Sequence, residues 1–275
     1  MRVVHRISEL RQTLDGATET ALVPTMGNLH DGHLSLIHQA HQHGQPVVAS
    51  IFVNPLQFGA GEDFQRYPRT FAADCAKLEA AGCDILFAPE DNEMYPEPQT
   101  FQVHPPLANE LCGAFRPGHF SGVCTVVLKL FEMVRRRYAV FGKKDYQQLF
   151  LLKAMVRQFN LPITILEGET TRSADGLALS SRNGYLSAPE RTQASQLNQQ
   201  LHWIIDKTAQ GERDFPLLEH QATTRLSESG WRVDYISIRS RSTLMPPSLT
   251  DHQLVVLGAA WLNKTRLIDN LEFVC

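Results

Sequence analysis

The amino-acid sequence predicts an α/β protein, with a mostly parallel sheet in its N-terminal part and a smaller α+β domain after it. Two observations lead to this prediction. Up to about residue 170, short apolar segments alternate with helix-length amphipathic segments, which is the pattern of right-handed βαβ units. Beyond residue 170, two helical patterns come first and strand-like alternation follows. The 275 residues suit about two domains, which we place at 1–170 and 171–275.

The N-terminal domain is predicted to contain five strands separated by helices. The expected strands are the apolar segments 21–25, 46–53, 84–88, 138–141 and 162–166. Apolar residues at helical spacing mark the intervening segments, around 34–40 and at 71–81, 122–137 and 145–159. Because ligands of parallel sheets bind outside the carboxyl ends of the strands, we expect functional residues directly after each strand.

The C-terminal domain is predicted to begin with helices at 190–211 and 217–230. Alternation from Val233 onward indicates a strand, and segments 254–261 and 266–271 indicate two more. No low-complexity tract or internal repeat is visible.

Composition excludes several classes of protein. The chain has 26 Lys and Arg against 29 Asp and Glu, a net charge of −3, which argues against a surface that tracks a phosphate backbone. The longest uncharged apolar run, 254–262, is too short to span a membrane, and no secretory signal is visible. The five cysteines include no CxxC pair, as expected of reduced thiols. These features predict a cytoplasmic protein that binds neither nucleic acid nor membrane.

The first strand–helix junction carries the most informative motif, PTMGNLHDGH at 24–33. Gly27 and Gly32 allow backbone to approach a ligand closely, and the helix that follows presents unpaired N–H groups. Such a helix start binds anions, and His30 and His33 add donors to it. We therefore interpret the motif as a nucleotide-phosphate site in which the histidines steady charge as pyrophosphate leaves. The alternative is that both histidines make ordinary loop hydrogen bonds.

Other motifs follow later strands. Asn54 and Gln57 offer neutral amides suited to a polar organic acid, although Asn-Pro is also a common turn. In FGKKDYQQ at 141–148, Lys144 suits phosphate and Asp145 suits magnesium bound to ATP, or Asp145 is simply a helix N-cap.

The segment DGLALSSRN at 175–183 puts two hydroxyls and a guanidinium in series, as in a phosphate clamp; the alternative is a capped turn. His38 and His41 share a helix face without a nearby Cys or carboxylate, so a zinc site is disfavoured there.

Six motifs in order give the chain a close resemblance to the pantothenate synthetase (pantoate–beta-alanine ligase) family of the HxGH nucleotidyltransferase superfamily. They are PTMGNLHDGH at 24–33, FVNPLQF at 52–58, RPGHFSGV at 116–123, FGKKDYQQL at 141–149, DGLALSSRN at 175–183 and TRLIDN at 265–270. The resemblance implies a Rossmann-like N-terminal domain, a C-terminal domain that closes over the active site, and a homodimer. It also implies that pantoate, ATP and magnesium form pantoyl adenylate and pyrophosphate, after which beta-alanine displaces AMP to give pantothenate.

The resemblance also implies site residues. Those expected to bind ATP are Met26, Gly27, Asn28, Leu29, His30, Asp31, Gly32, His33, Gly142, Lys143, Lys144, Asp145, Thr171, Leu179, Ser180, Ser181 and Arg182. His33 matches the catalytic proton donor, and Asp145 is expected to hold magnesium together with the ATP phosphates. Gln57 and Gln148 match the pantoate-binding glutamines, and Gln57 also matches a beta-alanine contact.

Two positions depart from the family pattern. Thr171 stands before Arg172 where the family usually has valine, and Cys112 stands before Gly113 where it commonly has glutamate. If that glutamate braces the RPGHF loop, the brace is missing here, so Arg116 is left out of the expected site.

Two other functions would also use a nucleotide-binding site. A nucleotidylyltransferase that transfers AMP to a phosphate would need cations where Asn54, Gln57 and Gln148 supply amides. A non-catalytic nucleotide-binding regulator is disfavoured because the histidines, Lys144, Asp145 and Arg182 are all present. Pyrophosphate release with and without pantoate separates the three possibilities.

Overall fold

A six-stranded parallel sheet forms the centre of the first part of the chain, as the computed structural model shows for residues 1–135, 137–248 and 250–275. Its order is β1-β4-β3-β2-β5-β6. The strands are β1 (Arg2–Val4), β2 (Ala21–Thr25), β3 (Val47–Ile51), β4 (Ile85–Phe87), β5 (Tyr138–Gly142) and β6 (Thr164–Gly168). The chain builds outward from β2 in one direction and from β5 in the other, so the topological switch point lies between β2 and β5.

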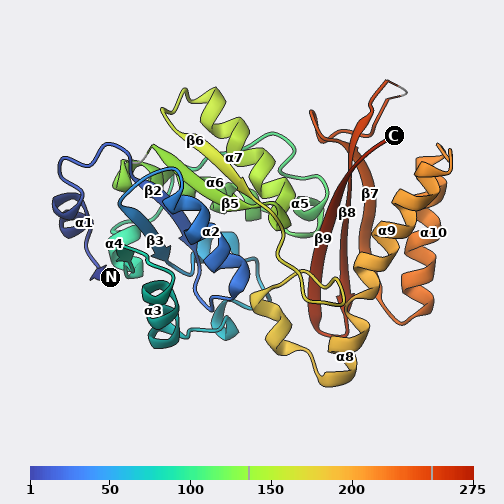
Figure 1. The fold of residues 1–275 in the computed structure, drawn as a ribbon, viewed down its shortest axis with the longest axis horizontal. Coiled ribbons are helices and arrows are strands. Elements are labelled where there is room, and N and C mark those ends of the chain that lie inside the picture. Colours follow the sequence, from blue (N-terminus) through green and yellow to red (C-terminus); the bar gives the residue numbers. More distant parts are fainter. Residues whose placement is uncertain (136, 249) are drawn as a thin grey trace. The chain divides into compact units, whose positions relative to one another are not determined.

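Helices cover this sheet (Figure 1). They are α1 (Ile7–Thr13), α2 (Asp31–His41), α3 (Phe71–Ala80), α4 (Asp91–Met94), α5 (Cys112–Phe115), α6 (His119–Val134) and α7 (Tyr146–Gln158). Leu36 and Ile37 of α2 and Leu78 of α3 pack with Val23 and Ala49 of the sheet in one buried cluster. The predicted helix 122–137 corresponds to α6, and its Arg136 lies outside the described residues.

The second sheet is antiparallel, in the order β7-β8-β9. Its strands are β7 (Arg232–Ser240), β8 (Gln253–Leu262) and β9 (Thr265–Val274), and its helices are α8 (Ala188–Gln193), α9 (Gln196–Ala209) and α10 (Phe215–Glu228). Helices α9 and α10 lie side by side against one face of the sheet (Figure 1), where Leu201, Leu218 and Val256 belong to a common core. The predicted α+β character is therefore confirmed.

The chain divides into two compact units. The first contains Met1–Gly142 and Gln148–Glu169, and the second contains Lys143–Gln147 and Thr170–Cys275. The fold class is confirmed, whereas the closure of one domain over an active site stays a prediction. The short segment 143–147 belongs to the second unit although most of the chain around it belongs to the first, a division that the sequence did not indicate.

Several predicted boundaries were wrong for physical reasons. The single helix predicted over 190–211 is two helices, α8 and α9, which are separated at Ala194 and Ser195. Strand β9 continues to Val274 rather than ending near residue 271. The polar Asp269, on the same face as Leu267 and Leu271, interrupts the apolar alternation that would have marked the strand. The three-residue β1 is too short for a periodic signal and was not predicted.

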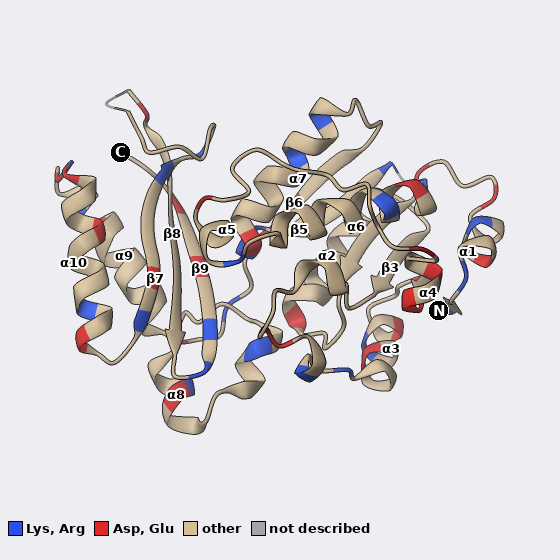
Figure 2. Cartoon of the chain, turned by 180° about the vertical axis from the view of Figure 1, so that it is seen from behind, with Lys and Arg blue, Asp and Glu red and all other residues tan. Residues whose placement is uncertain are grey.

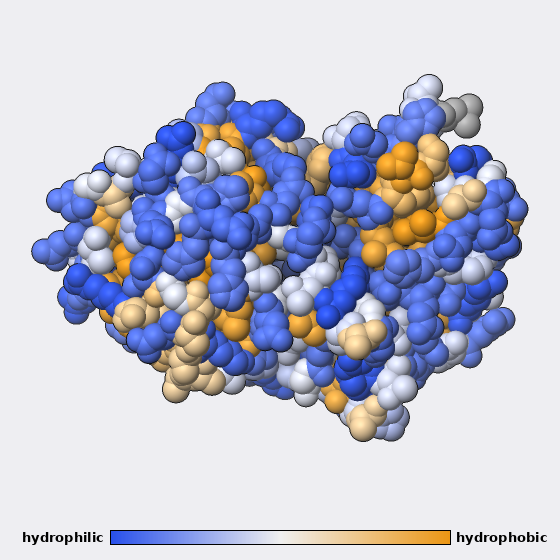
Figure 3. Space-filling model, viewed as in Figure 1, coloured by the Kyte–Doolittle hydropathy of each residue, from blue (hydrophilic) through white to orange (hydrophobic). Residues whose placement is uncertain are grey.

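Residues of both charge signs are spread along the elements of both units (Figure 2). On the face drawn in Figure 3, hydrophilic residues predominate and hydrophobic residues form separate patches. Among the described residues, no helix is both long enough and apolar enough to cross a membrane.

Candidate functional site

A glycine-containing loop joins β2 to α2, and α3 holds it in place. Gly27 has a φ of +84°, and a Cβ there would lie 3.2 Å from Asp74 Oδ2, so this position favours glycine. The buried Asp74 carboxylate accepts the N–H of Asn28 at 2.9 Å and that of Leu29 at 2.8 Å. Lys77 Nζ donates to the carbonyl of Leu29 at 2.6 Å. The sequence reasoning missed both Asp74 and Lys77, whose spacing on one face of α3 was the available signal.

The two histidines of the motif orient each other at the start of α2. The Nδ1 atom of His30 accepts the N–H of Gly32 at 3.2 Å, and the Nδ1 atom of His33 accepts the N–H of His30 at 3.3 Å. Their ring centroids are 4.1 Å apart. A neutral imidazole whose Nδ1 accepts carries its proton on Nε2. Both rings therefore have an Nε2–H donor at a helix N-terminus, which itself favours anions.

Gln57 is presented by a short 3-10 turn, Pro55–Gln57, and Asn54 sets its orientation. Asn54 Nδ2 donates to Gln57 Oε1 at 3.0 Å and to the carbonyl of Gly122 at 3.2 Å, and Tyr95 Oη donates to Asn54 Oδ1 at 2.7 Å. Asn54 is only 1% exposed. The sequence interpretation counted Asn54 as a ligand-facing amide, and this was wrong because its polar atoms are used within the protein.

The amide nitrogen of Gln57 donates to Met26 Sδ at 3.2 Å. A thioether sulfur is a weak acceptor, so an oxygen of a bound acid would form a stronger hydrogen bond with the same N–H. Gln57 can therefore exchange an internal partner for a ligand without leaving a buried donor unpaired.

The loop at 116–119 supports the backbone of Gln57. Arg116 forms a bidentate ion pair with Glu62. Its Nε donates to Oε1 at 2.8 Å and its Nη2 donates to Oε2 at 2.6 Å. His119 Nδ1 donates to the carbonyl of Gln57 at 2.8 Å. Cys112 is buried, and Glu62 supplies the carboxylate that braces Arg116. The departure at Cys112 therefore leaves this loop braced within the chain.

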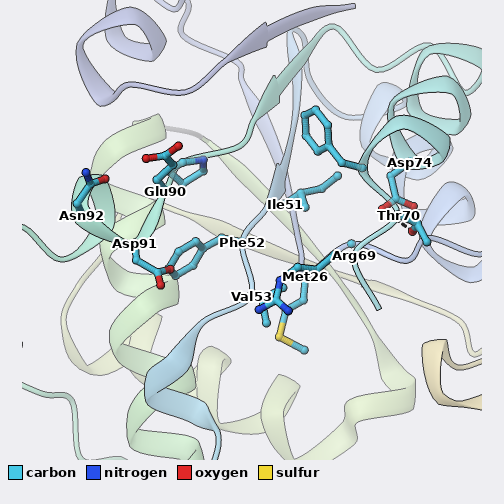
Figure 4. Close-up of a pocket in the computed structure, with 13 residues that line it drawn as sticks. Met26, Ile51, Phe52, Val53, Arg69, Thr70, Asp74, Glu90, Asp91 and Asn92 are labelled. Atoms are coloured by element: carbon cyan, nitrogen blue, oxygen red, sulfur yellow. Dashed lines mark hydrogen bonds between the residues drawn. The ribbon is translucent and has the colours of Figure 1, made fainter. Parts of the chain in front are cut away.

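A cavity of about 580 Å³ lies beside Met26 at the carboxyl ends of β2, β3 and β4 (Figure 4). Apolar side chains of Met26, Ile51 and Phe52 line it, and Arg69 and Glu90 belong to its polar part. Glu90 and Arg69 extend from opposite sides of the view in Figure 4. Such a lining suits a compact molecule with an apolar body and polar ends.

In the second unit, Lys143–Asp145 forms a 3-10 turn directly before α7. The ammonium of Lys143 forms an ion pair with Glu272 at 3.2 Å, so this side chain is directed to β9. Asp145 is exposed, and no hydrogen bond or ion pair joins its carboxylate to a residue that the structure describes. Lys144 and Asp145 are therefore the better candidates for direct contact with a nucleotide and its cation.

The segment 171–182 is a narrow loop followed by a 3-10 turn. The N–H of Leu179 donates to the carbonyl of Thr171 at 2.9 Å. The Ser180 hydroxyl then accepts the N–H of Arg182 at 3.2 Å and caps the turn Ser181–Tyr185. Thr171 thus contributes a backbone contact, which a Val-to-Thr exchange preserves.

The predicted site residues fall into two groups. The first unit holds residues 26–33, Gln57, Gly142 and Gln148, and within it Met26 and Gln57 are in contact. The second unit holds Lys143, Lys144, Asp145, Thr171 and 179–182. Their assignment to ATP, pantoate and beta-alanine stays a prediction.

A family model described as pantoate-beta-alanine ligase matches residues 2–272. The chain belongs to the pantoate-beta-alanine ligase family. The pantothenate synthetase of Thiobacillus denitrificans is 61% identical to it, over 99% of this chain and 97% of its own length. That of Methylobacillus flagellatus is 59% identical, over 99% of both chains.

Solved structures agree with this membership. The pantothenate synthetase of Thermus thermophilus matches with a TM-score of 0.93 and 44% identity, over 98% of this chain and 99% of that one. The Francisella tularensis pantoate-beta-alanine ligase, a complex with beta-gamma ATP and beta-alanine, matches with a TM-score of 0.84 and 33% identity, over 98% and 97% of the two chains. The predicted family is therefore confirmed.

Proposed function

We propose that this chain condenses pantoate with beta-alanine in an ATP-dependent reaction that passes through pantoyl adenylate. The family membership supports the overall reaction. The observation that carries the adenylate route is the pair of imidazoles, His30 and His33, with Nε2–H donors at the start of α2. A carboxylate does not condense with an amine at neutral pH until one of its oxygens becomes a leaving group, and these donors suit the departure of pyrophosphate.

In the first step, a pantoate carboxylate oxygen attacks the α-phosphorus of ATP, and the bond from that phosphorus to the bridging oxygen of pyrophosphate breaks. Gln57 and Gln148 hold the oxygens of pantoate, and uncharged amides do so without lowering the nucleophilicity of the carboxylate through an ion pair. His30, His33 and Lys144 stabilise the negative charge that collects on the departing pyrophosphate, and His33 is the proposed proton donor.

In the second step, the amine of beta-alanine attacks the acyl carbon and AMP leaves, while the nitrogen loses a proton. Gln57 is proposed to contact beta-alanine as well as pantoate. ATP binding in the first unit is assigned to residues 26–33 and Gly142. In the second unit it is assigned to residues 143–145, Thr171 and 179–182.

Magnesium is part of the proposal, and the residues present fit it. Within the described part of the chain, no three His, Cys, Asp or Glu side chains gather into a metal-binding group. Magnesium commonly uses one or two carboxylates together with substrate phosphates, and the exposed carboxylate of Asp145 supplies one such ligand. When bound, the ion would neutralise charge on the ATP phosphates.

A homodimer and a cytoplasmic location complete the proposal. The resemblance to the family implies the homodimer, and the cysteine usage expected of reduced thiols supports the cytoplasmic location. Light scattering coupled to size-exclusion chromatography tests the dimer, since a mass near 30.9 kDa would identify a monomer instead.

Rapid quench with labelled ATP tests the route. Enzyme, ATP, magnesium and pantoate without beta-alanine should release pyrophosphate in a burst near one equivalent per active site, and AMP should follow once beta-alanine is added. ADP and phosphate in place of AMP and pyrophosphate would overturn the adenylate route. Pyrophosphate release that does not require pantoate would point to a nucleotidylyltransferase.

A further inference from the structure

Strand β9 contacts, within the second unit, both segments that are proposed to bind the phosphates of ATP. The first contact is made by Asn270, which is 5% exposed. Its Nδ2 donates to the carbonyl of Lys143 and to that of Lys144, each at 2.9 Å. One amide group thus uses both of its N–H donors on consecutive carbonyls, which fixes the position of the turn that carries Lys144 and Asp145.

Glu272 reinforces this contact from the same face of β9. Residues two apart on a strand point the same way, and the Glu272 carboxylate accepts from Lys143 Nζ at 3.2 Å and from Tyr146 Oη at 2.8 Å. Arg241 Nη2 lies 3.1 Å from the same carboxylate. The turn 143–145 is therefore held at both ends.

Asp269 holds the second segment from the opposite face of the strand. Its carboxylate, 3% exposed, accepts both arms of Arg172 at 2.7 and 2.8 Å. Asn198 Nδ2 donates to it at 3.0 Å. Arg172 also donates to the carbonyl of Gly176 at 3.0 Å and to that of Asn270 at 3.1 Å. A planar guanidinium in this geometry fixes the loop that leads directly into 179–182.

We propose that Asp269 and Asn270 are positioning residues for ATP. Neighbouring residues of one strand point to opposite faces, so this dipeptide holds the turn at 143–145 on one side and the loop at 172–178 on the other. It acts on the nucleotide only through these segments, which keep Lys144 and Arg182 at a fixed separation. The inference rests on the proposed ATP role of the two segments.

The test compares three variants under steady-state conditions. Asn270→Ala and Asp269→Asn should each raise KM for ATP about tenfold or more, since a tenfold change corresponds to about 1.4 kcal/mol, and should leave KM for pantoate within about twofold. Asp234→Asn is the matched control, because Asp234 is a buried carboxylate of the same sheet that pairs with Arg266 at 2.7 Å and accepts from Trp261 at 3.1 Å. It should lower Tm and leave KM for ATP within about twofold.

A double-mutant cycle shows whether Asn270 acts through Lys144. In a Lys144→Ala background, Asn270→Ala should add little further increase in KM for ATP. Equal effects of Asn270→Ala in both backgrounds would overturn the proposal, as would variants that lose Tm without a change in KM for ATP. If Asn270→Ala does not fold, Asn270→Ser is measured instead. It keeps one donor, so its KM for ATP should lie between the wild-type value and the tenfold increase expected for Asn270→Ala.

Wild-type protein separates this inference from the proposed function. If wild type forms no pyrophosphate from ATP and pantoate, the proposed function fails. If wild type is active and Asp269→Asn and Asn270→Ala keep its KM for ATP, only the positioning inference fails.

Discussion

The segments proposed to bind phosphate in the two units are held in place in different ways. In the first unit, the loop at 27–29 is fixed by Asp74 and Lys77 on the helix that follows the next strand. In the second unit, the segments 143–145 and 172–178 are fixed by β9, which lies about a hundred residues further along the chain. In the first arrangement, two charged side chains bind backbone atoms of one loop. In the second, the neighbouring residues Asp269 and Asn270 bind two separate segments.

This difference has a consequence for substitution. A change at Asp74 should disturb one loop. A change at Asp269 should disturb the loop at 172–178, and a change at Asn270 should disturb the turn at 143–145.

Substitution of the two histidines at the start of α2 should have the largest effect on catalysis. His33→Ala and His30→Ala each remove an Nε2–H donor from the start of α2, and kcat for adenylation should fall about 10²- to 10³-fold, the scale of a lost donor to a developing anion. Single-turnover release of pyrophosphate at saturating ATP measures this step. His38→Ala, at an exposed position of the same helix, is the control and should keep near-normal turnover. Near-normal turnover in His33→Ala would contradict the proposed role.

Loss of the Asp74 carboxylate that holds the loop at 27–29 should have the next largest effect. Asp74→Asn replaces one acceptor oxygen by a donor that faces the backbone N–H groups of Asn28 and Leu29. Hydrogen bonds to a charged group contribute about 1.5–3 kcal/mol each, so the free energy of unfolding should fall by about 2 kcal/mol or more and KM for ATP should rise. Urea unfolding with Asp15→Asn, an exposed carboxylate, as control measures the stability. Unchanged stability would mean that the loop does not depend on α3.

The amides proposed to bind pantoate should show an effect of intermediate size. Gln57→Ala and Gln148→Ala should each raise KM for pantoate about tenfold, because a net hydrogen bond contributes about 1 kcal/mol and a buried partner is left unpaired. Asn54→Ala should raise the same KM although the amide of Asn54 bonds within the protein, since it orients Gln57 Oε1. Isothermal titration should show ATP affinity within about twofold of wild type for Gln57→Ala. A loss of ATP affinity instead would reassign the residue.

Contiguous motifs could be predicted from the sequence, whereas contacts between distant segments could not. The β2–α2 loop was predicted because its glycines, histidines and flanking strand and helix are contiguous, and the order of strand and helix patterns was enough for the parallel sheet. The role of Asn54 was mistaken because a buried amide and a ligand-facing amide look alike in sequence. The roles of Asp269 and Asn270 could not be predicted, because they depend on which distant segments the antiparallel sheet brings to its two faces.

The smallest expected effect is a pH-dependent contribution of Glu272 to stability. Burial raises the pKa of this carboxyl, but hydrogen bonds from Tyr146 and Lys143 and the charges of Lys143 and Arg241 outweigh it, and the net pKa is lowered. A lowered pKa in the folded state stabilises the protein above the ordinary glutamate pKa of about 4.3. That stabilisation is lost as the pH falls through the folded-state pKa, because protonation then removes the ion pairs.

Glu272→Gln should therefore be less stable than wild type at pH 7, by at most about 1 kcal/mol because the pair is partly exposed, and the difference should shrink as the pH falls below about 4.3. Urea unfolding of both proteins between neutral and acid pH measures it. Val274→Ala, at an exposed position of the same strand, is the control and should show no such pH dependence. A difference that grows on acidification would mean that burial, and not the contacts with Tyr146, Lys143 and Arg241, dominates the pKa of Glu272.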